Sequence, residues 1–216
     1  MARVSNTLIG KASGSVGNAT FSTWKGINVL KEKAVSVANP NTDLQIMRRS
    51  ALSQSVAIYR LISAAVSVGF KKLATGMSAY NAWASNALKD AFDYSSPPTA
   101  TFVPSDLLIS KGTITSTAIG TIVADRSANT AVVTFSSTVD APGQSLTDKA
   151  VLAVYNTNEN DWVSLATSDL RSSGTADIPL PAFWATGNNL VVYIGFYNEA
   201  SGESSDSLND TAVIVA

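Results

Sequence analysis

The sequence predicts an α+β protein: an N-terminal β-ribbon arm plus an antiparallel helix hairpin, followed by a C-terminal antiparallel β-sandwich. Three patterns support this prediction: a Gly-, Ser- and Thr-rich alternating stretch over 7–37, apolar residues at three-and-four spacing over 43–92, and short β-rich runs after residue 106. A linker over 94–104 separates the last two, because neither a helix nor a central strand tolerates its density of proline. We therefore expect two domains, residues 1–96 and 97–216.

The ribbon is the first predicted element. Residues 21–25 alternate as on the two faces of a strand, and residues 16–18 have the composition of a turn. We therefore expect a hairpin or a three-stranded ribbon. A ribbon this polar and rich in glycine has little core of its own and is marginally stable alone. It needs a partner surface, either on the rest of the chain or on another subunit.

A short joint leads from the ribbon into the first helix. Pro40 favours extended backbone in the residue before it. Thr42 and Gln45 have the spacing of a capping box, in which the two side chains satisfy backbone N–H groups at the helix start. Asp43 adds a negative charge at the positive end of the helix dipole. We interpret these residues, with Arg49, as a structural joint that has no catalytic character.

Two helices are predicted after the joint, over residues 43–73 and 79–92. The first is long for a globular protein and is expected to break near residues 67–69. The second places Tyr80, Trp83 and Phe92 on one face. Aromatic residues at helical spacing are more often core than a ligand-binding surface, and we interpret them as core. A short link between two helices predicts an antiparallel hairpin.

The C-terminal domain is predicted from short β-rich runs separated by turn residues, a spacing typical of sandwiches of immunoglobulin, fibronectin or jelly-roll type. The runs cover residues 107–115, 121–124, 130–136, 149–156, 162–167, 175–179, 190–198 and 211–215. A polar loop over 199–207 precedes the last strand.

Composition excludes several function classes. The 216 residues include no cysteine and no histidine, so disulfides, thiolate metal sites and histidine-based catalysis are excluded. Only 14% of the residues are charged, which is a liability in free solution unless surface is buried against partners. No N-terminal apolar segment and no membrane span are apparent, so we expect synthesis in the cytoplasm.

Charge is divided unevenly along the chain. Residues 1–100 carry eleven Lys and Arg against four acidic residues, whereas residues 101–216 carry four against twelve. One interpretation is that the two halves face different surroundings, or face each other across copies of the protein. The other is that two domains of unlike composition are folded together. Six residues are candidates for contact with another subunit or with nucleic acid, although paired basic residues usually face solvent without a binding role. These residues are Trp24, Lys25, Arg48, Arg49, Lys71 and Lys72.

No catalytic, cofactor-binding or metal residues are predicted. The glycines at 10, 14 and 17 lack the spacing of a phosphate-binding loop. The aspartates of the C-terminal half fall in or beside turns, where Asp is favoured for local hydrogen bonding. The acidic residues of the loop before the last strand lack the spacing of an EF-hand. We therefore expect a protein that is not an enzyme.

Motifs over nearly the whole chain resemble an uncharacterised protein family of similar length in Bacteroidota. In the N-terminal half they are Ser13, Gly14, Val16, Gly17, Asn18, Trp24, Lys25, Gly26, Asn39, Pro40, Thr42, Gln45, Arg49, Gly69, Phe70, Lys71 and Lys72. In the C-terminal half they are Asp148, Lys149, Ala150, Val154, Tyr155, Asn156, Leu180, Pro181, Trp184 and residues 192–196. One departure is Leu30 and Lys31, where the family tends to place an arginine. The front half is also similar to small proteins of phage structural gene clusters, and that resemblance implies a virion component.

Two functions follow as hypotheses. The first is a self-assembling bacteriophage virion protein of the capsid, coat or tail, made in the host cytoplasm. Its partners would be copies of itself, other virion proteins and, non-specifically, nucleic acid. The alternative is an adhesion module whose β-sandwich recognises a glycan or cell-surface partner through exposed aromatic residues. Trp162, Trp184 and Tyr197 are the candidates for that role, with burial in the core as their ordinary interpretation.

Overall fold

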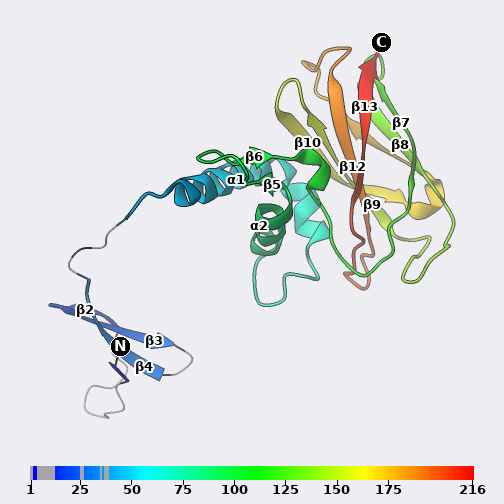
Figure 1. Ribbon diagram of the computed structural model, residues 1–216. Helices are drawn as coiled ribbons and strands as arrows, with labels where there is room; N and C mark the ends of the chain where they lie inside the picture. Colours follow the sequence, from blue (N-terminus) through cyan, green and yellow to red (C-terminus); the bar gives the residue numbers. More distant parts are fainter. Residues whose placement is uncertain (1, 4–12, 25–26, 35, 37–38) are drawn as a thin grey trace. The chain divides into compact units, whose positions relative to one another are not determined.

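A computed structural model describes residues 2–3, 13–24, 27–34, 36 and 39–216 (Figure 1). The chain divides into two compact units, Met1–Asn41 and Thr42–Ala216, which we call the ribbon and the body. The division falls at the joint and not near residue 96, because the helices share a buried core with the strands that follow them.

The ribbon is a four-stranded antiparallel sheet with the order β1-β4-β3-β2. Its strands are β1 (Ala2–Arg3), β2 (Gly14–Val16), β3 (Ala19–Trp24) and β4 (Ile27–Glu32). Gly17 has φ +56° in the turn between β2 and β3, a conformation that glycine adopts without steric cost. None of the ribbon residues whose exposure is described (13–23, 27–34, 36 and 39–41) is buried.

The body begins with two helices, α1 (Asp43–Gly69) and α2 (Ala79–Asp90), close to the predicted ranges. Ser78 caps α2, since its hydroxyl oxygen accepts from the N–H of Asn81 at 3.2 Å. The helices pack on each other through Tyr59 of α1 and Tyr80 of α2, whose ring centroids lie 4.8 Å apart. A small hairpin of β5 (Phe92–Asp93) and β6 (Thr101–Phe102) follows, and then a 3-10 turn, η1 (Pro104–Asp106).

The rest of the body is one seven-stranded sheet with the order β10-β9-β12-β13-β7-β8-β11. A 3-10 turn, η2 (Arg171–Ser173), joins β10 to β11. The strands are β7 (Ile119–Asp125), β8 (Thr130–Phe135), β9 (Lys149–Asn156), β10 (Asp161–Leu170), β11 (Thr175–Pro179), β12 (Asn189–Tyr197) and β13 (Leu208–Val215).

The α+β class is confirmed, but the predicted antiparallel β-sandwich is not. The strands form a single sheet, and β13 runs parallel to β7. The sheet curls until its outermost strands approach each other, so that the N–H of Asp177 in β11 donates to Asp169 Oδ2 in β10 at 3.4 Å. The parallel pair joins strands far apart in the sequence, and strand periodicity alone carries no information about such a partner.

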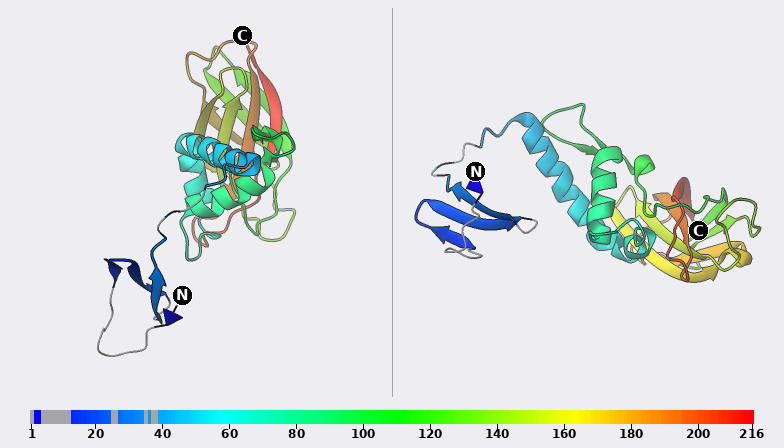
Figure 2. Two further views of the ribbon diagram at one scale, coloured as in Figure 1. Left: turned by 60° about the vertical axis from the view of Figure 1, so that its left-hand side comes forward. Right: turned by 90° about the horizontal axis from the view of Figure 1, so that it is seen from below.

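Two large buried clusters hold the body together. The first lies between the helices and the outer face of β9, β10 and β12, on the side where Figures 1 and 2 place α1 and α2. The second fills the inside of the curled sheet and includes Phe135, Trp184 and Phe196. Strand β9 is therefore buried on both faces, which explains its nearly continuous apolar sequence. A smaller cluster forms around Met47 and Phe92.

Candidate functional site

The joint residues lie at the boundary between the two units. Thr42 is the N-cap of α1, and its hydroxyl oxygen accepts from the N–H of Gln45 at 3.4 Å. Asp43 lies in the first turn. Pro40 precedes Asn41, which has φ +46°, a region that asparagine tolerates better than most residues. These residues start the helix, and their geometry is that of a structural element.

The predicted contact residues of the ribbon are described only in part. Trp24 ends β3 and pairs with Ile27 of β4. Its side chain and all of Lys25 lie outside the described residues. Two further lysines of the ribbon, Lys31 and Lys33, are exposed.

The two basic pairs of the body are not brought together. Arg48 lies near the start of α1, and Lys71 follows its end, so about 30 Å separates the pairs at 1.5 Å per helical residue. The guanidinium of Arg48 lies 3.9 Å from the centre of the Tyr94 ring. Arg49 is exposed on the solvent side of α1. The pairs do not form one continuous phosphate-binding surface.

Two carboxylates, those of Glu199 and Glu203, lie close to Lys71 and Lys72. Lys72 Nζ lies 3.1 Å from Glu203 Oε1, and Lys149 Nζ lies 2.5 Å from Glu199 Oε2. Hydrogen bonds from Thr113 and Lys72 hold the pKa of Glu203 below its usual value. The carboxylate of Glu199 raises the pKa of Lys149. Phosphate would have to compete with these carboxylates, so the surface is poorly suited to nucleic acid.

The Gly69–Phe70 part of the family-like motif has a packing role. A Cβ on Gly69 would lie 2.6 Å from the carbonyl oxygen of Ile109, so only glycine allows this close approach of two backbones. Phe70 is fully buried in the first cluster. The motif therefore docks the end of α1 on the segment that leads into the sheet.

Trp162 belongs to a buried aromatic stack. Its ring stacks on Tyr155 and on Tyr193, at centroid distances of 4.6 and 5.6 Å. The residue is only 6% exposed. Burial raises the pKa of both tyrosines. Trp162 therefore presents no open ring face to a sugar.

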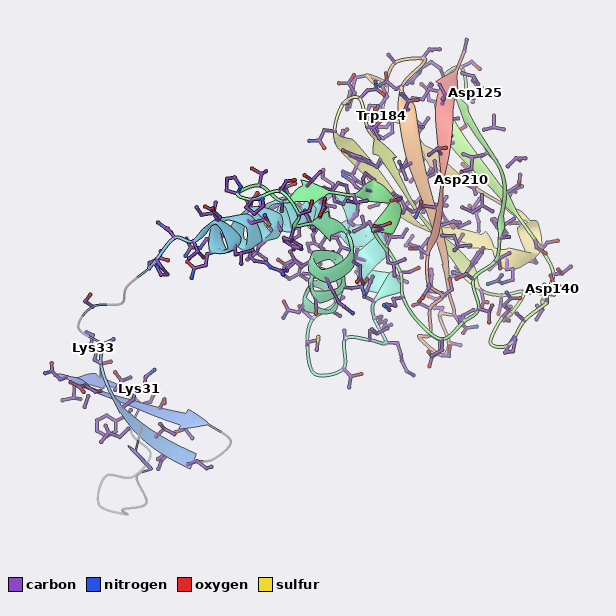
Figure 3. All side chains as sticks on the ribbon, in the orientation of Figure 1. Lys31, Lys33, Asp125, Asp140, Trp184 and Asp210 are labelled. Atoms are coloured by element: carbon purple, nitrogen blue, oxygen red, sulfur yellow. The ribbon has the colours of Figure 1, made fainter. Side chains whose placement is uncertain are left out.

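The other two aromatic candidates also serve the core. Trp184, which is labelled in Figure 3, is buried inside the curled sheet. Its indole N–H donates to Asp161 Oδ2 at 3.1 Å. Tyr197 is half-buried against the first cluster.

A pocket of about 240 Å³ lies beside the aromatic stack, between α1, Phe102 and the β9–β10 hairpin. Its polar lining includes Gln54 and Asn160. Gln54 Nε2 donates to the carbonyl oxygen of Ala100 at 3.1 Å, and Asn160 Oδ1 accepts from the Tyr155 hydroxyl at 2.9 Å. No Asp, Glu, Lys or Arg lines this pocket among the described residues. The pocket therefore lacks a carboxylate or ammonium group for acid–base chemistry.

The buried polar centre of the body is Asp148 with Arg171, a pairing that sequence reasoning missed. Both side chains are fully buried, and Arg171 Nε donates to Asp148 Oδ2 at 3.3 Å. Asn198 Nδ2 donates to the other carboxylate oxygen at 2.9 Å. The guanidinium also bonds Thr117 and lies over the Phe196 ring. Burial lowers the pKa of Arg171, which is nevertheless a cation at all physiological pH. The group ties together four segments that flank the strands and has a structural role.

The remaining carboxylates do not gather into a site. No group of three or more Asp and Glu residues suited to a metal ion is present among the described residues. Asp125 accepts from the N–H and the hydroxyl of Ser127 at 2.7 Å, and these bonds lower its pKa.

An exposed apolar surface on the sheet was also missed. Val123, Val213 and Val215 are 51%, 49% and 50% exposed, on neighbouring strands β7 and β13. Their sequence neighbours Ala124 and Ile214 point into the second cluster. The sequence carried one signal for this surface. Apolar residues occupy successive positions in these strands, so both faces of the sheet carry them, and such a pattern indicates burial on both faces.

Helix α1 is long and apolar enough to cross a membrane by length and composition alone. One third of its most apolar stretch is buried inside the body. Core helices of soluble proteins have the same properties, so this observation is weak evidence for a membrane span.

Comparisons with known proteins give a family but no activity. A search of the curated proteins found no match. A solved structure of the chicken CNTN1 FN1–FN3 domains matches 56% of this chain at 10% identity, with a TM-score of 0.35. The match spans 39% of that structure's chain. A family model described as a family of unknown function, DUF6266, matches residues 11–209. The match covers most of the ribbon, both helices and nearly all of the sheet, so the chain belongs to the family of unknown function DUF6266.

Proposed function

We propose that this chain is a non-enzymatic, self-assembling structural protein. The observation that carries the proposal is the lack of any buried residue in the part of the ribbon whose exposure is described. A small sheet without a buried face does not offset the conformational entropy lost on ordering its chain. The ribbon therefore needs a surface to cover it, and neighbouring copies would supply that surface.

Charge supports an association between copies. The ribbon, residues 1–41, carries five Lys and Arg against one Glu, a balance of +4. The body carries ten against fifteen acidic residues, a balance of −5. Opposite charges steer association and reject wrong partners. A basic unit without a core and an acidic unit with one are therefore suited to each other.

The form of assembly that we propose is a bacteriophage virion, in the capsid, coat or tail. The resemblance of the front half to small proteins of phage structural gene clusters supports it. Contact with other virion proteins or with nucleic acid belongs to the same proposal. The exposed Lys31 and Lys33 are better suited to phosphate than Lys72, which is paired with Glu203. Such contact would be non-specific and would weaken with salt.

We include in this proposal the finer description of the body as a β-sandwich. Strands β10, β9, β12 and β13 form one half of the sheet, and β7, β8 and β11 form the other. Two residue pairs join the halves, Ile214 with Ala124 and Val215 with Asp125. The second buried cluster has side chains from both halves, as the core of a sandwich would.

The alternative function is recognition of a glycan or a cell-surface partner. Two of the three aromatic residues proposed for that role are not available at the surface. Trp162 and Trp184 are buried, and each has a structural partner. We therefore give self-assembly priority.

Electron microscopy and light scattering of the purified full-length chain test the proposal. We expect rings, tubes or shells, and a mass that rises with protein concentration. We also expect the ribbon to resist proteases in the assembled protein. A chain that remains monomeric at high concentration, with its first 41 residues rapidly digested, would exclude self-assembly.

A further inference from the structure

We propose that the ribbon of one copy packs on the outer face of strands β7, β8 and β13 in the body of another copy. The inference rests on the proposed function, and it names the surface through which copies associate. We call this surface the valine face, and it consists of Val123, Val132, Val213 and Val215.

The register of the strands makes the valine face continuous. Ile214 pairs with Ala124 and Val215 with Asp125, so one residue earlier Val213 lies beside Val123. Across the other edge of β7, Val123 pairs directly with Val132 of β8. Side chains of paired residues share one face of a sheet. Three neighbouring strands thus carry a row of valines on one outer face, in which Val123, Val213 and Val215 are exposed and Val132 is half-buried.

No other element of the described body covers the valine face. The helices cover the outer face of β9, β10 and β12, while Figure 1 shows β7 and β8 on the side away from α1 and α2. Natural sheets rarely leave a row of β-branched side chains open to water, because it invites association. The body alone therefore leaves this surface without a partner.

Acidic residues flank the valines. Asp177 of β11 pairs with Val132, which places it at the end of the valine row. Asp125 pairs with Val215 and follows Val123 by two residues on the same face. Both lie on a body whose net charge is negative. A partner suited to this face needs apolar side chains next to cations.

One face of the ribbon has this pattern. Ile27, Val29 and Lys31 alternate along β4. Lys33 follows β4 at the next position of the same two-residue repeat, and Figure 3 labels both lysines. Ile27 and Val29 are only half-buried in the ribbon itself, and both lysines are exposed. The opposite face of β4 carries Asn28, Leu30 and Glu32 and lacks the cations. The valine face and this basic–apolar face are therefore complementary in both polarity and charge.

Cysteine cross-linking tests the contact, because the chain has no cysteine of its own. Val29→Cys is combined with Val213→Cys in the full-length protein and oxidised. One matched control moves the ribbon cysteine to the other face of β4, as Leu30→Cys with Val213→Cys. A second moves the body cysteine to an exposed loop, as Val29→Cys with Phe183→Cys. We expect covalent dimers or ladders in at least about tenfold excess over both controls, because a disulfide needs Cα atoms within about 7 Å.

The other outcomes are equally decisive. A cross-link confined to monomers places the ribbon on its own body and overturns the proposal. Oligomers that form normally, without cross-linking above the controls, also overturn it but leave self-assembly intact. Light scattering on the cysteine-free chain at the same concentration is decisive for the proposed function itself, since a monomer there excludes assembly by any surface.

Charge reversal provides an independent test. Lys31→Glu with Lys33→Glu places like charges opposite Asp125 and Asp177, and we expect the concentration of half-assembly to rise by at least about tenfold. Adding Asp125→Lys and Asp177→Lys in the same chain should restore assembly. An unchanged assembly curve after the first reversal, or a failure of the second to rescue, would contradict the contact.

Discussion

The ribbon and the body are built from the same kinds of β-strand but differ in what lies beneath them. Strands β3 and β4 pair over six residues, yet none of their described side chains is buried. Strand β9 pairs on both edges and is buried on both faces, under α1 on one side and inside the curled sheet on the other. Backbone pairing is thus equivalent in the two units, whereas apolar burial is confined to one of them.

This difference indicates where the free energy of folding lies. Hydrogen bonds exchange with water and contribute modestly, whereas the burial of apolar area is the dominant favourable contribution. We therefore expect the body to unfold as a cooperative unit of its own, and the ribbon to gain its order from whatever covers it. A comparison of matched substitutions in the two units can confirm or refute this expectation.

The largest effect is expected from removing a buried phenylalanine. Phe70→Ala should lower the free energy of unfolding by about 4 kcal/mol, because Phe70 is fully buried and its loss leaves a cavity. Phe21→Ala in the ribbon is the matched control and should change it by less than about 0.5 kcal/mol in the monomer. Urea unfolding followed by tryptophan fluorescence measures both. Equal losses would show that the ribbon folds as part of the body.

The next effect concerns the buried ion pair. Asp148→Asn should cost about 3 kcal/mol at neutral pH, because it leaves the cation of Arg171 buried without its counter-charge. Glu199→Gln removes one partner of the exposed pair with Lys149 and should cost less than about 0.5 kcal/mol. The same urea titration applies to both variants. If the two losses are similar, burial of the first pair does not matter for stability.

A smaller effect is expected at the joint between the units. Thr42→Ala removes the oxygen that accepts from the N–H of Gln45 and should cost about 1 kcal/mol. Thr42→Ser keeps the oxygen and should be nearly neutral. The double variant Thr42→Ala with Gln45→Ala should impair folding or assembly and no chemistry. Unchanged thermal unfolding and normal assembly of the double variant would refute a structural role for the joint.

Local features of the fold could be predicted from the sequence. The helix start at Thr42 and the range of α2 follow from capping residues and three-and-four spacing, which act over a few residues. The polarity of the ribbon indicated that it has little core of its own, and none of its residues whose exposure is described is buried. The joint between helix and ribbon was likewise evident from Pro40 and Thr42.

Features that depend on distant pairing could not be predicted. The parallel contact of β13 with β7 joins residues about ninety positions apart, and Asp148 reaches Arg171 and Asn198 across the sheet. Single-sequence periodicity contains no information on such partners. The valine face could in principle have been predicted, because Val123 and Val213 are followed directly by Ala124 and Ile214, which face the core. Its exposure could not be predicted, because exposure depends on which elements cover the sheet.

The smallest effect concerns acid, and it follows from Glu203, which lies in the loop between β12 and β13 and is paired with Lys72. Thr113 and Lys72 lower the pKa of Glu203 in the folded state, so the folded body binds this proton more weakly than the unfolded chain does. The stabilisation is therefore present above the unfolded pKa, about 4.3, and is lost as pH falls through the lower folded value. The loss should be small because the pair is exposed and screened. Urea midpoints of the wild type and Glu203→Gln should differ slightly at pH 7 and converge in acid. A difference that grows as the pH falls would show that the Lys72–Glu203 contact does not stabilise the folded body.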